Sequence, residues 1–151
     1  MQKTINVALA FGMAGEMYDL TPRRVDAKEV AADVLIGGIA GVSADGKYGT
    51  MDSATYKTFA GIFVRPKEAI NYGGSTPLEA SVKVPAGCTV QVASMGRVKV
   101  TIPTGETWVA GDKLSVTQDF VLGKDGEPYI SNVAKVVVGG AAGEVAVVEI
   151  G

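Results

Sequence analysis

The most informative feature of the sequence is what it lacks. Among 151 residues there is no histidine, and cysteine occurs once, at Cys88. Without imidazole, the Ser-His-Asp and Cys-His catalytic arrangements and most zinc sites cannot form. One cysteine excludes an intrachain disulfide, and with no histidine to activate it Cys88 is expected to be a small core residue. These absences close most familiar catalytic chemistries and agree with the expectation that the protein is not an enzyme and holds no metal or cofactor.

A strong net charge and long apolar runs are also missing. The 14 basic residues nearly balance the 16 acidic ones, for a net charge of −2, so there is no basic excess to neutralise nucleic-acid phosphates. Uncharged runs such as residues 4–15 and 34–44 are shorter than the roughly 18–20 residues of a membrane-spanning helix. Residues 4–11 alternate in polarity, which indicates a strand rather than a signal peptide. We expect no nucleic-acid or membrane partner.

Glycine, by contrast, is abundant, with 20 residues against an average usage of about 7%. From residue 59 onward, short segments of alternating or continuous apolar residues are separated by turns rich in glycine or proline. This spacing predicts an all-β fold, a barrel or jelly-roll-like domain. The predicted strands are residues 59–64, 80–84, 88–92, 98–102, 107–109, 113–117, 133–138 and 144–150.

Glycines also mark the predicted turns. Residues 94–96, ending in Gly96, are expected to join strands 88–92 and 98–102 as a hairpin. The apolar segment 34–42 is expected to be a strand with a bulge or sharp bend at its glycines.

The chain divides into two predicted parts. Residues 1–33 are expected to hold a first strand, an extended arm and a short helix, and residues 34–151 the β domain. The helix is predicted over Ala27–Asp33, because Asp26 is a suitable N-cap and Glu29 stands at the capping-box position.

The arm is the candidate interaction site. Apolar side chains on an irregular segment must be buried against something outside it. The paired arginines that follow Pro22 offer forked donors suited to carboxylates on a partner. The arm either docks on another subunit or folds back over an edge strand of its own sheet. The candidate interface residues are Phe11, Met13, Glu16, Met17, Tyr18, Asp19, Arg23 and Arg24.

Residues 41–48 contain most of a phosphate-binding loop, G-x-x-x-x-G-K, but Tyr48 stands where the hydroxyl ligand of Mg²⁺ belongs. Such a loop also needs a following helix, and the residues after Tyr48 are a poor helix start. Asp45 and Gly46 are better explained as the turn of a β-hairpin.

The sequence resembles the structural cement, or capsid decoration, proteins of tailed bacteriophages. The similarity is carried by an ordered set of short segments, each weakly specific alone. They are AFGMAGE (10–16) with TPR (21–23), FAGIFVR (59–65), VPAGCTVQV (84–92), GRVKV (96–100), VAGDKL (109–114) and GEVA (143–146).

The resemblance implies a β-rich structural protein, made in the host cytoplasm, that binds the outer surface of an assembled phage head. It implies two partners: the major capsid protein, whose neighbouring subunits it would clamp, and itself, as a homodimer or homotrimer at symmetry axes. A different hypothesis is a carbohydrate- or host-surface-binding module of a tail or fibre, with Trp108 and Tyr129 as its platform. A third is an enzyme that uses Lys, Asp or Glu chemistry.

Overall fold

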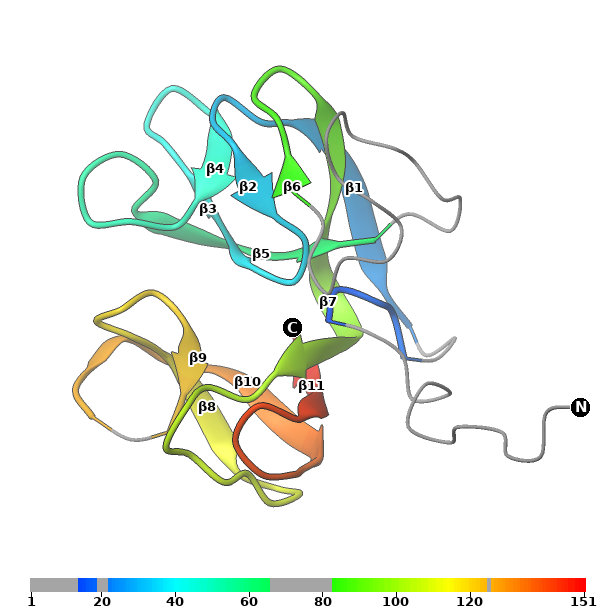
Figure 1. Cartoon of the computed structure of the whole chain (residues 1–151). Coiled ribbons are helices and arrows are strands. Elements are labelled where there is room, and N and C mark those ends of the chain that lie inside the picture. Colours follow the sequence, from blue (N-terminus) through cyan, green and yellow to red (C-terminus); the bar gives the residue numbers. More distant parts are fainter. Residues whose placement is uncertain (1–13, 19–21, 66–82, 125) are drawn as a thin grey trace, which may run out of the picture.

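The structure, a computed structural model, describes residues 14–18, 22–65, 83–124 and 126–151. This part of the chain is all-β and contains no helix, so none is present that could cross a membrane (Figure 1). The strands are β1 (Arg24–Glu29), β2 (Val34–Leu35), β3 (Ile39–Val42), β4 (Tyr48–Thr50), β5 (Thr58–Val64), β6 (Lys83–Val84), β7 (Thr89–Thr101), β8 (Lys113–Thr117), β9 (Leu122–Gly123), β10 (Pro128–Val138) and β11 (Val145–Ile150).

The long strand β7 lies in the middle of the large sheet and pairs with strands from both halves of the chain. The nine-stranded sheet has the order β4-β3-β5-β7-β11-β10-β8-β9, with β1 as an additional partner of β7. The first half of β7 pairs with β1 and β5, and residues 96–101 pair with β11. Strands β2 and β6 form a separate two-stranded sheet. All the pairings are antiparallel, and the large sheet curls into a half-barrel.

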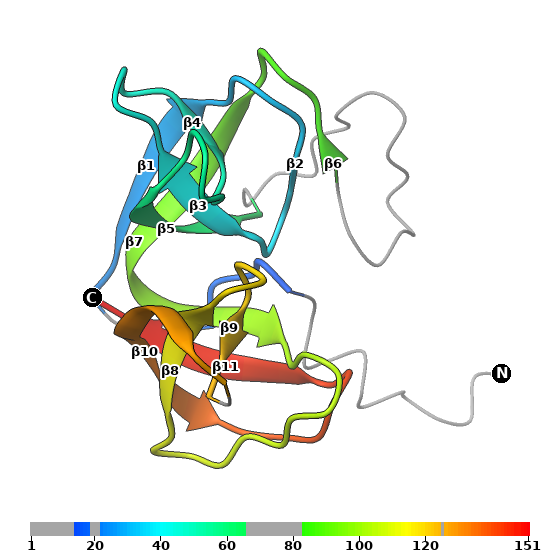
Figure 2. The ribbon, with the colours of Figure 1, turned by 90° about the vertical axis from the view of Figure 1, so that its left-hand side faces the viewer.

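Two lobes result from this arrangement. Strands β1 to β6 surround the beginning of β7, and β8 to β11 surround its end; Figures 1 and 2 show β7 passing from one lobe into the other. Gly96 lies where the partners of β7 change and has φ +127, a conformation that L side chains rarely adopt. Its neighbours are the side chains of Met17 and Arg23, which lie where a Cβ atom would point.

The buried residues form two apolar clusters, and β5 separates them. Ile62 and Val64 belong to the larger cluster, whereas Phe63 belongs to the smaller one, so both faces of this strand are buried. In β7, Val90 and Val92 face the smaller cluster. The half of β7 beyond Gly96 contributes Val98 and Val100 to the larger cluster, which fills the second lobe and extends to β3 and β5 of the first.

The all-β class and several strands are confirmed. Strands β5, β8 and β10 cover the predicted segments 59–64, 113–117 and 133–138, β10 is longer than predicted, and β11 covers all but the first residue of 144–150. The predicted strand at 107–109 is wrong, because these residues contribute only an isolated bridge between Trp108 and Gly140. Segment 34–42 is not the single bent strand expected: it is divided at Gly37 and Gly38 into β2 and β3, which belong to different sheets. Residues 1–13 and 66–82 lie outside the described part of the chain, so the strand at 4–11 and the beginning of the one at 80–84 are not covered. The jelly-roll form and the division at residue 33 stay predictions.

The predicted hairpin at residues 94–96 is wrong. Residues 89–101 form one continuous strand, because β1 and β5 pair with its first half and β11 with its second. A glycine with positive φ here bends a long strand where it changes partners, rather than reversing the chain.

The predicted helix over Ala27–Asp33 is also wrong. Residues 24–29 form β1, which pairs with residues 89–95, and the chain continues through a bridge between Val30 and Tyr48. The capping pattern of Asp26 and Glu29 is a local preference worth about 1 kcal/mol. A full edge of hydrogen bonds to β7 outweighs it, as does burial of Val30 in the smaller cluster.

The turn at Asp45 and Gly46 is confirmed. It joins β3 and β4 as a hairpin, with Gly46 at φ +77. The residues after Lys47 form a strand, so the phosphate-binding loop lacks the helix it requires.

The close approach of β5 to its neighbour β7 yields a testable prediction. A Cβ atom at Gly61, which has φ +145, would collide with the backbone carbonyl oxygen of Ala93. Gly61→Ala should therefore lower the free energy of unfolding by about 3 kcal/mol or more, measured by urea denaturation. Gly46→Ala, at positive φ in open space, should cost only about 1 kcal/mol. Equal losses would contradict this close packing.

Candidate functional site

Residues 14–18, the first described stretch of the predicted arm, lie against β7 of the same chain. The Gly15 amide donates to the carbonyl oxygen of Lys99 (2.8 Å), and the Lys99 amide donates to that of Glu16 (2.9 Å). Met17 forms an antiparallel bridge with Val98. This segment therefore adds a short length of strand to the end of β7.

Side chains anchor the same segment. The Glu16 carboxylate lies 3.2 Å from the ammonium group of Lys99, whose side chain is only 12% exposed. Met17 is half-buried and packs against the larger apolar cluster. These two candidate interface residues thus contact their own sheet.

Gly15 is the tightest point of the contact. A Cβ atom there would collide with the side chain of Ile36 and lie 3.0 Å from the amide nitrogen of Gly37. The Gly15 carbonyl oxygen also accepts a hydrogen bond from the amide of Arg65, at the end of β5. Only a residue without a side chain fits this place, so the segment has a defined position between β5 and β7.

Other candidate residues are exposed and gather around the bend of β7. Arg24 pairs with Met95, Arg23 lies beside Gly96, and the Tyr18 amide donates to the Arg97 carbonyl oxygen (2.9 Å). Tyr18 and Met95 are 41% and 44% exposed. We name this surface, made of Tyr18, Arg23, Arg24 and Met95, the arginine corner.

The charges of the arginine corner are weakly engaged. Arg24 lies 3.6 Å from Asp26, and both side chains are largely exposed, a pairing of little energetic value. No hydrogen bond or ion pair joins the side chain of Arg23 to another residue within the described ranges. Within the described residues, both guanidinium groups are therefore exposed and neither is held by a strong contact.

The remaining candidates, Phe11, Met13 and Asp19, lie outside the described residues, and their interface role stays a prediction. Sequence reasoning missed Met95, because a residue assigned to a hairpin turn carries no expectation of a partner. Met95 lies beside the paired arginines only because Arg24 pairs with it in the register of β1 on β7, and the sequence alone does not give that register.

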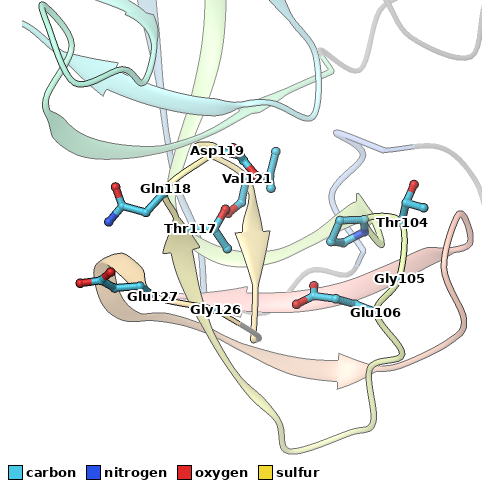
Figure 3. Close-up of a pocket in the computed structure, with 10 residues that line it drawn as sticks. Thr104, Gly105, Glu106, Thr117, Gln118, Asp119, Val121, Gly126 and Glu127 are labelled. Atoms are coloured by element: carbon cyan, nitrogen blue, oxygen red, sulfur yellow. The ribbon is translucent and has the colours of Figure 1, made fainter.

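A pocket of about 370 Å³ opens in the second lobe, beside β9 (Figure 3). The loop that follows β7 forms one wall, and the β8–β9 turn with the residues before β10 forms the other. Its lining includes three carboxylates and no lysine or arginine. The lining residues are Pro103, Thr104, Gly105, Glu106, Thr117, Gln118, Asp119, Val121, Gly126 and Glu127.

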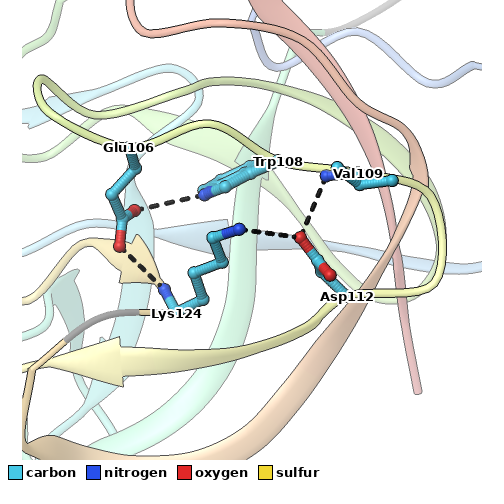
Figure 4. Close-up of polar contacts among 5 residues, drawn as sticks. All are labelled: Glu106, Trp108, Val109, Asp112 and Lys124. Atoms are coloured by element: carbon cyan, nitrogen blue, oxygen red, sulfur yellow. Dashed lines mark hydrogen bonds and ion pairs between the residues drawn. The ribbon is translucent and has the colours of Figure 1, made fainter.

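Glu106 lines the pocket, is 8% exposed and joins two segments of the second lobe (Figure 4). Its carboxylate accepts hydrogen bonds from the indole N–H of Trp108 (3.1 Å) and from the backbone amide of Lys124 (2.9 Å). Glu106 thus satisfies a buried indole and fixes the strand end at β9, a structural role.

The aromatic platform proposed for carbohydrate binding is wrong. Trp108 is 2% exposed, because it packs in the larger cluster with its N–H bonded to Glu106. Tyr129 is half-buried and packs edge-to-face against Phe120, with ring centroids 5.0 Å apart. A stacking surface for sugar rings needs exposed faces, which this tryptophan does not offer.

Asp112 closes the turn before β8. Its carboxylate accepts a hydrogen bond from the Val109 amide (2.9 Å) and lies 3.1 Å from the ammonium group of Lys124 (Figure 4). The Val109 hydrogen bond, and then the lysine, lower the pKa of Asp112 below its ordinary value.

Among the described residues, no group of three or more Cys, Asp or Glu side chains is arranged so that it could hold a metal ion. The prominent features are instead a continuous sheet, a segment fastened to it and an exposed corner of aromatic, methionine and arginine side chains. These features are typical of the class of structural and binding proteins.

Comparison with known families agrees with this class. The family model for structural cement proteins (E217 gp24/Pam3 gp6) matches residues 1–151, the whole chain. The chain therefore belongs to the phage structural cement protein family, whose members are structural components of the capsid rather than enzymes. No curated protein matches the sequence.

The seating of residues 14–18 can be tested at Gly15. Gly15 and Gly87 have the same backbone conformation, with φ +85 and +86, but only Gly15 has no space for a Cβ atom. Gly15→Ala should therefore lower the free energy of unfolding by about 1–3 kcal/mol more than Gly87→Ala, in urea denaturation. If the two variants lose equal stability, residues 14–18 do not pack on β7 as described.

The lowered pKa of Asp112 predicts a pH dependence. Because its folded-state pKa lies below the ordinary value of 3.8, the ionised carboxylate stabilises the fold above that pH, and the contribution is lost as pH falls below it. The stability difference between the wild type and Asp112→Asn should thus be present at pH 6 and vanish in acid. Lys124→Met should retain most of this dependence, because the Val109 hydrogen bond is the larger cause. If the stability difference between the wild type and Asp112→Asn does not change with pH, the pKa of Asp112 is not lowered in the folded protein.

Proposed function

We propose that this cement protein binds the outer surface of the assembled phage head and clamps neighbouring subunits of the major capsid protein. The match of the family model to the whole chain carries the proposal. The fold supports it, because clamping requires a body that does not deform. A strand with hydrogen-bonded neighbours along both edges, as β7 has, provides such a body.

The candidate interface residues divide into two groups in this proposal. Glu16 and Met17 act by fastening the N-terminal segment to β7. The exposed Tyr18, Arg23 and Arg24 contact a partner subunit. Phe11 and Met13 precede the fastened segment 14–18, Asp19 follows it, and all three belong to the interface with the capsid.

Affinity per contact can be modest under this proposal. Many symmetry-related copies on one head, each engaging more than one capsid subunit, supply avidity without strong individual contacts. The protein acts as a homodimer or homotrimer at symmetry axes, is made in the host cytoplasm, and contacts neither nucleic acid nor membrane. No observation favours the carbohydrate-binding alternative, since Trp108 is buried.

Binding to heads tests the proposal directly. Purified protein should co-sediment with expanded heads that lack decoration, and should raise the temperature at which those heads release their DNA. Heads that carry their full decoration serve as the control, because their sites are occupied. A protein that stays in the supernatant with undecorated heads does not perform this function.

The residues of the capsid contact can be tested in the full-length chain. Phe11→Ala combined with Met13→Ala should weaken co-sedimentation with heads at least about tenfold, because truncated apolar anchors dominate the loss of affinity at interfaces. Leu35→Ala, at an exposed position of β2, is the matched control and should bind as the wild type does. Unchanged urea midpoints would show that all variants fold, and undiminished binding by the double variant would remove these two residues from the interface.

A further inference from the structure

The acidic pocket of the second lobe has no role in the proposed contact with the capsid. Its open rim carries the carboxylates of Asp119 and Glu127, both exposed, and the side chain of Val121, which is 44% exposed. In Figure 3, Asp119 on the β8–β9 turn and Glu127 just before β10 lie on the side of the pocket opposite Thr104. The rim is therefore suited to a cationic group that also has apolar surface.

The same chain carries a surface of the complementary kind. The arginine corner joins two exposed guanidinium groups to Tyr18 and Met95. Aromatic, methionine and arginine side chains are enriched in the cores of protein interfaces. A guanidinium group can also bind a carboxylate through two parallel hydrogen bonds.

One molecule cannot bring these two surfaces together. The corner lies at the bend of β7, beside the start of β1 and the end of β11, because Arg24 pairs with Met95 and Gly151 packs on Met95. The pocket lies beside β9, which ends the sheet order and is separated from β7 by β11, β10 and β8. Figure 2 shows the start of β1 and the C-terminus together on the left, away from β9.

We propose that the acidic pocket receives the arginine corner of a second copy, in a head-to-tail contact. With a net charge of only −2, repulsion between whole molecules is small, and the segregated charges of two copies attract. Repetition of a contact between two different surfaces closes into a ring when the rotation permits. The inference deepens the homo-oligomeric part of the proposed function: it assigns the arginines to a neighbouring copy and leaves the capsid contact to other residues.

Charge reversal on each surface tests the contact, with self-association measured by sedimentation velocity in the absence of heads. The wild type should associate with rising concentration. Arg23→Glu with Arg24→Glu, and separately Asp119→Lys with Glu127→Lys, should each weaken association at least about tenfold. The variant that combines all four substitutions should recover it, because both surfaces then have exchanged sign.

A matched control and the contrary outcomes complete the experiment. Lys47→Glu with Lys57→Glu makes the same change of charge at exposed positions of the first lobe and should associate as the wild type does. A monomeric wild type, or four substitutions that do not restore association, would overturn the proposal. Loss of association by the arginine variant alone would indicate a symmetric corner-to-corner contact and would equally overturn it.

The failure of this inference is distinguishable from failure of the proposed function. A wild type that remains monomeric in solution and still co-sediments with undecorated heads refutes the head-to-tail contact and keeps the capsid role. Association in solution without any binding to heads gives the reverse result. Thermal unfolding of each variant, monitored by circular dichroism, confirms that the proteins compared are folded.

Discussion

The pairing of β7 along both of its edges is the constraint on which the rest of the structure depends. Residues 91–93 have β1 and β5 as neighbours, and residues 97–99 have β11 and the segment 14–18. Moving one lobe against the other would bend this strand and disturb hydrogen bonds on both sides of it. The bend is already fixed at Gly96, where packed side chains occupy the space around the glycine. The two lobes are therefore joined by hydrogen-bonded sheet rather than by a linker, which is the property that a clamp requires.

Much of the fold could be predicted from the sequence because polarity alternates wherever one face of a strand is buried. The Leu114–Val116 pattern of β8 is of this kind, whereas β5 and β11 were predicted from short continuous apolar segments that end at turn residues. The errors arose where distant pairing overrode a local signal. Gly96 was predicted to lie in a turn, but its pairing with β11 keeps it within a continuous strand. The capping pattern near Asp26 favours a helix locally, but pairing of this segment with β7 is stronger.

The candidate site was predictable in part, for a similar reason. Apolar and charged side chains on a glycine-rich segment indicated that the arm needs a docking surface, but not which one. The ion pair of Glu16 with Lys99 joins residues 83 positions apart, and no local pattern reports such a distance. For Trp108, by contrast, the sequence did contain a local indication of burial. A glutamate two residues before a tryptophan is a local arrangement that can satisfy a buried indole, and it could have argued against an exposed platform.

The fastening of residues 14–18 also limits how this protein can reach a capsid. Addition of this segment as a strand to a capsid sheet would require its main-chain groups, and those of Gly15, Glu16 and Tyr18 are already bonded to β7. Breaking them would also release the close fit of Gly15 against Ile36 and expose the half-buried Met17. Contact through side chains leaves these bonds intact. In the proposed contact with the capsid, exposed side chains rather than the main chain of residues 14–18 therefore reach the partner.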